Sequence, residues 1–147
     1  MNETDSHRTP TGPALLGYAG VVPFAALALV VVLIGGTWRD LALRAFLAYG
    51  AVILSFLGGI RWGAAARAAQ ARTGQYALAV LPSLWAWAFL LADSPLTAAW
   101  GLLAGFLLMG FADWMKPAPG IAPWLASLRV RLTAAVALCH ALVIVSL

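Results

Sequence analysis

Uncharged, mostly apolar stretches alternate with charged positions along the chain, and this pattern predicts its elements. Five such runs, each about 16 to 23 residues long, cover most of the sequence: Ala14–Gly36, Ala45–Ile60, Thr73–Ala92, Ser94–Ala112 and Leu132–Leu147. A helix of about 17–25 residues crosses the hydrocarbon core of a bilayer. The shorter runs reach this length if flanking arginines lie along the helix and extend to the head groups. We therefore predict an all-α bundle of five transmembrane helices.

Turn residues mark the boundaries of the runs. Gly35 and Gly36 end the first predicted helix, and the segment Asp93–Pro95 predicts a tight turn between the third and the fourth. Pro23 and Pro82 lie inside runs and predict kinks. Residues 1–12 are polar, so we expect a disordered tail there, followed by a single transmembrane domain over residues 13–147.

Composition excludes an ordinary soluble domain. Hydrophobic residues make up 63% of the 147 residues and charged residues 10%, against about 45–50% and about 25% in soluble domains. The net charge of +4 is spread singly or in small groups between apolar runs, which is typical of topology signals and not of a nucleic-acid interface. Cys139 is the one cysteine, so neither an intrachain disulfide nor a cysteine-rich metal site is expected.

The basic residues predict an orientation. Two of them, Arg39 and Arg44, fall on one side of the predicted bundle, and seven fall on the other: Arg8, Arg61, Arg67, Arg72, Lys116, Arg129 and Arg131. The positive-inside rule then places the N-terminus in the cytoplasm and the C-terminus outside. The tail is acidic and poor in arginine, unlike a mitochondrial transit peptide. We expect a bacterial cytoplasmic (inner) membrane in preference to a mitochondrial inner membrane.

Small residues at a spacing of four predict close helix contacts. Two ridges occur, Ser55-Gly59-Gly63 in the second run and Thr97-Gly101-Gly105 in the fourth. Apolar burial drives little association between helices in lipid, so small residues that let backbones approach are the usual packing signal. We expect both ridges, with Gly58 beside the first, to face other helices of the same bundle. The alternative is a seam between two copies of the chain.

His140 is an ionisable residue at membrane depth, the usual place to look for function. One interpretation is a proton relay, or a ligand to a quinone or haem. The other is a neutral histidine bonded to a backbone carbonyl or to a serine of a neighbouring helix. We favour the second, because no other predicted span contains a histidine.

Arg61 and Asp113 end the second and fourth predicted helices on the same side. They can pair across the bundle, with Arg129 or Arg131 joining them. A structural ion pair at the interface is the simpler interpretation. The alternative is a site for an anionic head group or substrate.

Trp85 and Trp87 of the third run lie too deep for an interfacial aromatic belt. With Pro82 and Ser83 they can wall a pocket for a flat lipophilic ligand. We favour the simpler interpretation, in which large aromatic side chains fill space opposite the glycine ridges.

No zinc-protease, serine-hydrolase or nucleotide-loop motif occurs in the chain. We accordingly assign no catalytic residue, expect no cofactor or metal, and lean towards a protein that is not an enzyme.

The segment from Tyr49 to Gly63 resembles the signature of an uncharacterised family of multi-pass membrane proteins, that of transmembrane protein sixty-nine, with members in bacteria and mitochondria. Further matching segments are Gly17–Gly20, Pro23-Phe24, Leu81–Ser83, Trp85–Trp87, Pro123-Trp124, Leu128-Arg129 and Leu132-Thr133. The resemblance implies a helical inner-membrane protein and supplies no activity. Within the signature, Ser55, Arg61 and Trp62, with the neighbouring glycines, are the positions to test first.

Three functions are compatible with these features. We favour a non-enzymatic accessory or assembly factor that contacts a larger, possibly respiratory, membrane complex through its helices. The alternative is a small transporter or a protein that binds a lipophilic ligand such as a quinone or lipid. A membrane enzyme using His140 and Arg61 is disfavoured, because the two lie at different depths.

Overall fold

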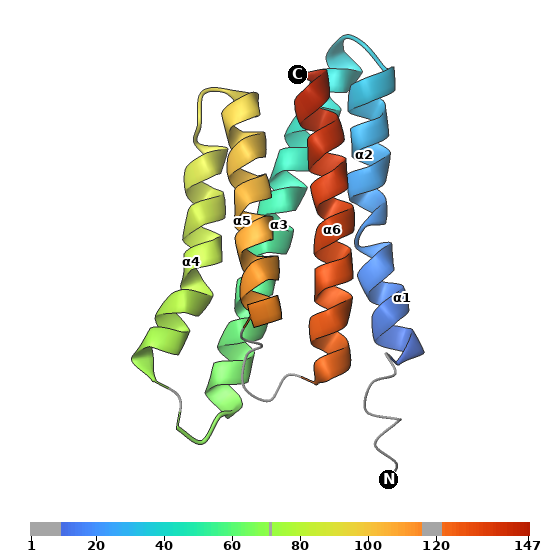
Figure 1. Ribbon diagram of the computed structural model, residues 1–147. Coiled ribbons are helices and arrows are strands. Elements are labelled where there is room, and N and C mark those ends of the chain that lie inside the picture. The colour runs from blue at the N-terminus through green and yellow to red at the C-terminus, as the bar shows by residue number, and fades with distance from the viewer. Residues whose placement is uncertain (1–9, 71, 116–121) are drawn as a thin grey trace.

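The computed structural model describes residues 10–70, 72–115 and 122–147, and their regular structure is entirely helical (Figure 1). The helices are α1 (Thr11–Ala19), α2 (Val22–Leu33), α3 (Thr37–Arg67), α4 (Thr73–Leu90), α5 (Pro95–Met115) and α6 (Pro123–Ser146). They run side by side as one bundle, and the predicted all-α class is confirmed for these residues. α1 takes in Thr11 and Gly12 from the predicted tail, while residues 1–9 lie outside the described part of the chain.

α1 and α2 form one rod that is interrupted at Gly20 and Val21, just before Pro23. A proline has no N–H to donate to the carbonyl four residues earlier, so the helix loses a bond there. The carbonyl of Gly20, which lies in the interruption between the two helices, accepts a hydrogen bond from the Tyr49 hydroxyl of α3 at 2.9 Å. This bond supplies a partner to a backbone group that lipid cannot satisfy.

α3 is a 31-residue helix that includes the charged flanks of its apolar run. At about 1.5 Å per residue it is ~46 Å long, well above the ~30 Å of a hydrocarbon core. Gly36, with φ of 67°, turns the chain into it. Arg39 then donates to the carbonyl of Val31 and, at 2.7 Å, to that of Ser146, which ties the ends of α2 and α6 to the start of α3.

The core lies where α2, α3, α5 and α6 meet. Its largest fully buried side chains include Phe24, Phe46 and Phe106, one from each of the first three of these helices. The ring of Phe24 contacts the other two edge-on, with centroid distances of 5.5 and 5.9 Å. α4 packs on the outside of this core against α3 and α5.

Four helical segments of the described chain are long and apolar enough to cross a membrane: Thr11–Leu33, Thr37–Arg67, Pro95–Met115 and Trp124–Ser146. α4, which corresponds to the third predicted span, is not among them. In Figure 1 the start of α1 and the end of α6 lie at opposite ends of the bundle. Large apolar side chains such as Leu15, Leu33 and Val145 are exposed on the outer surface, as expected when lipid is the surrounding solvent.

The glycines divide into two groups by what surrounds them. Gly58 lies against the backbone of Ala79 in α4, Gly101 lies against the ring of Phe89, and Gly105 meets Leu54 and Trp85. In the part of the chain that the structure describes, no atom lies within 4 Å of a Cβ added at Gly59 or Gly63. Gly101 and Gly105 therefore make helix contacts inside the bundle, as predicted for the fourth run. Gly59 and Gly63 of the second run are exposed on the outer surface.

Replacing Gly58 with alanine should destabilise the fold, because the added methyl group meets the Ala79 carbonyl across the α3–α4 contact. Overpacking of this kind costs about 1–3 kcal/mol. The matched control is Gly59→Ala, one residue along the same helix, which should be neutral or slightly stabilising because alanine is the better helix former. Thermal unfolding in detergent measures both, and equal melting temperatures for the two variants would contradict the packing described here.

Candidate functional site

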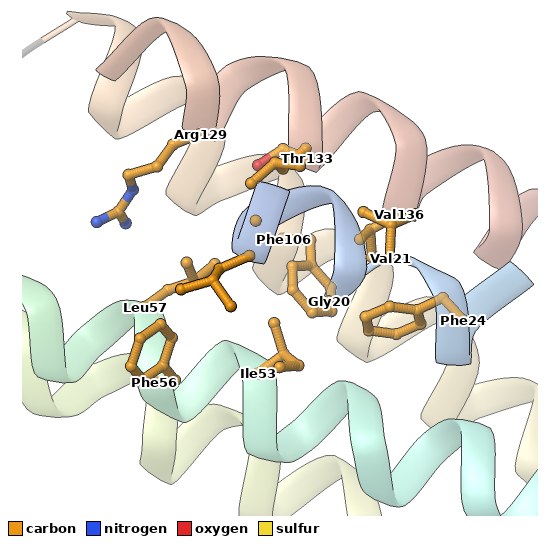
Figure 2. A pocket seen from close by; sticks show the side chains of 13 residues that line it. Gly20, Val21, Phe24, Ile53, Phe56, Leu57, Phe106, Arg129, Thr133 and Val136 are labelled. Atoms are coloured by element: carbon orange, nitrogen blue, oxygen red, sulfur yellow. The ribbon is translucent and has the colours of Figure 1, made fainter. Parts of the chain in front are cut away.

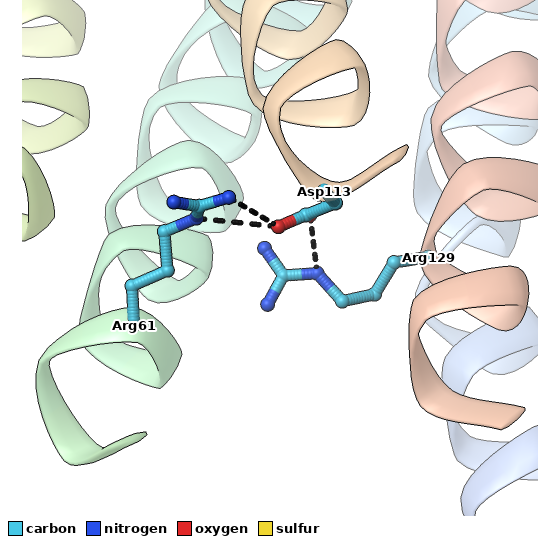
Figure 3. A network of polar contacts seen from close by, with 3 residues as sticks. All are labelled: Arg61, Asp113 and Arg129. Carbon is cyan, nitrogen blue, oxygen red and sulfur yellow. Dashed lines mark hydrogen bonds and ion pairs between the residues drawn. The ribbon is translucent and has the colours of Figure 1, made fainter. Parts of the chain in front are cut away.

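Three charged side chains from three helices meet near one end of the bundle (Figure 3). Asp113 of α5 lies between them: its Oδ1 accepts from Arg61 Nε at 3.2 Å and from Arg61 Nη2 at 2.9 Å. Its Oδ2 lies 2.7 Å from Nε of Arg129 in α6. We call these residues the arginine–aspartate cluster. The structure thus brings together the pair Arg61 and Asp113, with Arg129 and not the exposed Arg131 as the third member.

The cluster is buried and carries more positive than negative charge. The side chains of Asp113 and Arg129 are each 4% exposed and that of Arg61 is 16% exposed. Two guanidinium groups share one carboxylate, so one positive charge is in excess. The terminal nitrogens Nη1 and Nη2 of Arg129 have no hydrogen-bond partner among the described residues. Burying a charge without full pairing costs several kcal/mol, so this arrangement is suited to taking up an anion.

Arg129 is buried in a helix, whereas the sequence pattern placed it before the fifth run, in a polar connection. α6 begins at Pro123 and not at Leu132, so Arg129 lies two turns inside a helix. Proline favours the first turn of a helix, and Pro123 was a signal for this earlier start. The stretch between the fourth and fifth predicted runs also contains Pro117 and Pro119, which lie outside the described residues.

Two apolar grooves flank the cluster. The first, which we call the α1–α3 groove, has a volume of about 190 Å³, and Arg129 stands at one end of it (Figure 2). Its other lining residues are Leu16, Gly17, Gly20, Val21, Phe24, Ile53, Phe56, Leu57, Phe106, Leu132, Thr133 and Val136.

The second groove, the α4–α5 groove, is more open and has a volume of about 600 Å³. Arg61, Pro82 and Trp85 line it. The Trp85 indole N–H donates to the carbonyl of Gly101 at 2.7 Å, which ties α4 to α5. Trp87 lies exposed on the outer surface and, like Ser83, is not part of this groove. The linings of the two grooves therefore each include a different arginine of the same cluster.

His140 lies in the aromatic core and apart from the cluster. It is fully buried, with ring centroids 4.6 Å from Phe46 and 5.4 Å from Phe106. Its Nδ1 lies 3.0 Å from the Val136 carbonyl, which is the backbone-bonded arrangement favoured from the sequence. Phe46 and Arg61 are ~22 Å apart along α3, so His140 and Arg61 do not form one site.

Neither of the other predicted positions joins the cluster. The Ser55 hydroxyl donates to the Ala51 carbonyl of its own helix at 2.8 Å. Trp62 is exposed, and its ring packs against Tyr76 with a centroid distance of 4.9 Å. Among the described residues no group of three His, Cys, Asp or Glu side chains is placed to hold a metal ion.

The long apolar helices, their lipophilic outer surface and the charged cluster at one end define a multi-pass helical membrane protein. The chain belongs to the family described as "Protein of unknown function (DUF3429)", which it matches over residues 9–145.

Two curated relatives are also named as transmembrane proteins. The chain is 37% identical over 125 residues to transmembrane protein 69 of Xenopus tropicalis, covering 82% of this chain and 49% of that protein. It is 35% identical over 120 residues to transmembrane protein 69 of Mus musculus, covering 71% of this chain and 48% of that protein. The chain thus spans about half the length of these relatives. No solved structure matches it.

Replacing Asp113 with asparagine should destabilise the bundle strongly, because it leaves two guanidinium groups beside each other without a countercharge. Breaking a buried ion pair in this way costs about 3–5 kcal/mol. The control is Asp93→Asn in the exposed turn between α4 and α5, which should change stability little. Unfolding in detergent with increasing dodecyl sulfate measures both variants, and a wild-type midpoint for Asp113→Asn would show that the cluster is not structural.

Proposed function

We propose that this chain is a non-enzymatic accessory or assembly factor that contacts a larger complex within the membrane, such as a respiratory complex. The observation that carries the proposal is the outward-facing pair Gly59 and Gly63 on α3. A glycine inside a helix costs about 1 kcal/mol relative to alanine. Among the described residues these two make no close contact that would compensate for that cost.

The surroundings of the two glycines support a helix-docking face. Val52 and Phe56 are exposed on the same stripe of α3, at helical spacing from Gly59 and Gly63. A pair of glycines four residues apart lets another membrane helix approach closely. We propose that this partner helix belongs to the larger complex. The alternative is a helix of a second copy of this chain, and the copurification experiment below distinguishes the two.

The proposed setting is a bacterial inner membrane crossed five times. α4 has 18 residues, which at about 1.5 Å each is ~27 Å, close to the thickness of a hydrocarbon core. Together with the four longer spans it gives an odd number of crossings. The excess of arginines at the end of the bundle that holds the cluster favours a cytoplasmic N-terminus and an outside C-terminus.

A second candidate function is the binding of a lipophilic ligand. The two apolar grooves support it, since the lining of each includes one arginine of the cluster, Arg129 in the first and Arg61 in the second. Apolar walls with few polar groups are typical of ligand sites.

Labelling of single cysteines tests whether α4 crosses the membrane. In a Cys139→Ser background, Gln70→Cys and Ser94→Cys flank α4 at its two ends, and both positions are exposed. In intact spheroplasts a membrane-impermeant maleimide should label Ser94→Cys and the control Gly35→Cys, but not Gln70→Cys. Labelling of both α4 flanks, or of neither, would reduce the number of crossings to four and place both termini on one side.

Substitution of both outward glycines tests the accessory role. Gly59→Leu with Gly63→Leu should abolish copurification of a stoichiometric membrane partner from native membranes in mild detergent, because bulky side chains prevent close helix approach. Ala141→Leu, an enlargement at an exposed position of α6, should keep the partner. A clean monomer from wild-type membranes would overturn the proposal, and recovery of two identical chains would replace the partner by a homodimer.

A further inference from the structure

Arg129 presents unused hydrogen-bond donors in a buried position. Its side chain is 4% exposed, and its Nε is engaged with Asp113. Nη1 and Nη2 lack a partner in the part of the chain that the structure describes. In Figure 3 these two nitrogens point from α6 towards α3, on the side where Arg61 approaches the same carboxylate. An anion at this point would meet the excess charge of the cluster and the free donors together.

The α1–α3 groove starts from the same side chain. Figure 2 shows Arg129 at one end of the groove and apolar side chains, among them Leu57, Ile53 and Phe24, along the rest of it. Thr133 is the one other polar side chain in the lining. A groove with a cationic end and apolar walls complements an amphiphile that has an anionic head group and an apolar tail.

We propose that the α1–α3 groove binds one amphiphilic anion, with its carboxylate or phosphate on Nη1 and Nη2 of Arg129 and its alkyl chain along the groove. This inference rests on the second proposed function and names the chemistry of that ligand. The planar guanidinium offers two parallel donors, which match the oxygens of either head group. The volume of about 190 Å³ is below the about 300–1,000 Å³ of pockets that enclose a whole ligand. The groove therefore holds part of one alkyl chain, and the rest of the molecule lies in the bilayer.

Equilibrium binding of radiolabelled probes to the delipidated full chain in detergent tests the inference. The probes are palmitate, phosphatidylglycerol and hexadecanol, the last with the chain length of palmitate and no charge. Palmitate, phosphatidylglycerol or both should bind at one per chain, and hexadecanol at least about tenfold more weakly. Arg129→Gln should weaken the anions about tenfold to a hundredfold, since a charged hydrogen bond is lost, and leave hexadecanol unchanged.

A second pair of variants addresses the groove without touching the cluster. Ile53→Trp fills the groove and should weaken every probe, whereas the neighbouring Val52→Trp lies on the outer surface and should have no effect. Should Arg129→Gln fail to fold, this pair and the preference of the wild type for an anionic probe over hexadecanol still decide the question.

Each outcome separates the inference from the function on which it rests. Binding of hexadecanol as tight as that of the tighter-binding anion would overturn the anion site and leave a lipophilic-ligand protein. Binding of no probe would overturn both, and unchanged binding in Ile53→Trp would overturn the groove as the site. Binding of palmitate alone identifies a free acid as the ligand, and binding of phosphatidylglycerol alone identifies a membrane lipid.

Discussion

One carboxylate, that of Asp113, holds together three helices that are distant in sequence. It bonds Arg61 of α3 on one oxygen and pairs with Arg129 of α6 on the other, while its own helix, α5, supplies the buried centre of the bundle. In a low-dielectric surrounding such pairs are strong once formed, but they must offset a large desolvation penalty. The relative positions of α3, α5 and α6 at this end of the bundle are therefore constrained by charge as well as by side-chain volume.

The other constraint on the bundle is the close approach of backbones at glycine. Gly58 brings α3 onto the backbone of α4, and Gly101 and Gly105 make room on α5 for Phe89 and Trp85 of α4. α4 is the helix that does not reach the apolar character of the other spans. Its position is secured by these contacts and by the Trp85 hydrogen bond to the Gly101 carbonyl. Small residues thus substitute for hydrophobic driving force where lipid offers none.

The length and apolar character of the runs were enough to predict helices, their turns at Gly36 and Asp93–Pro95, and the pairing of Arg61 with Asp113. The rotation of each helix about its axis was not predictable, because all faces of these helices are apolar and periodicity carries little signal. For this reason the Ser55-Gly59-Gly63 ridge was expected inside the bundle, whereas the contact falls one residue earlier, on Gly58. For the same reason the burial of Arg129 was not predicted: its charge led to its assignment to a polar connection.

Two buried polar sites among the described residues differ in the charge that they carry. His140 is fully enclosed by aromatic rings, and a carbonyl one turn earlier on its own helix accepts its Nδ1–H. A neutral imidazole bonded in this way needs no external charge and can lie deep in the core. The arginine–aspartate cluster cannot reach neutrality with its own three side chains, because guanidinium groups remain protonated. These three side chains therefore keep one net positive charge beside the α1–α3 groove, of which Arg129 is a lining residue.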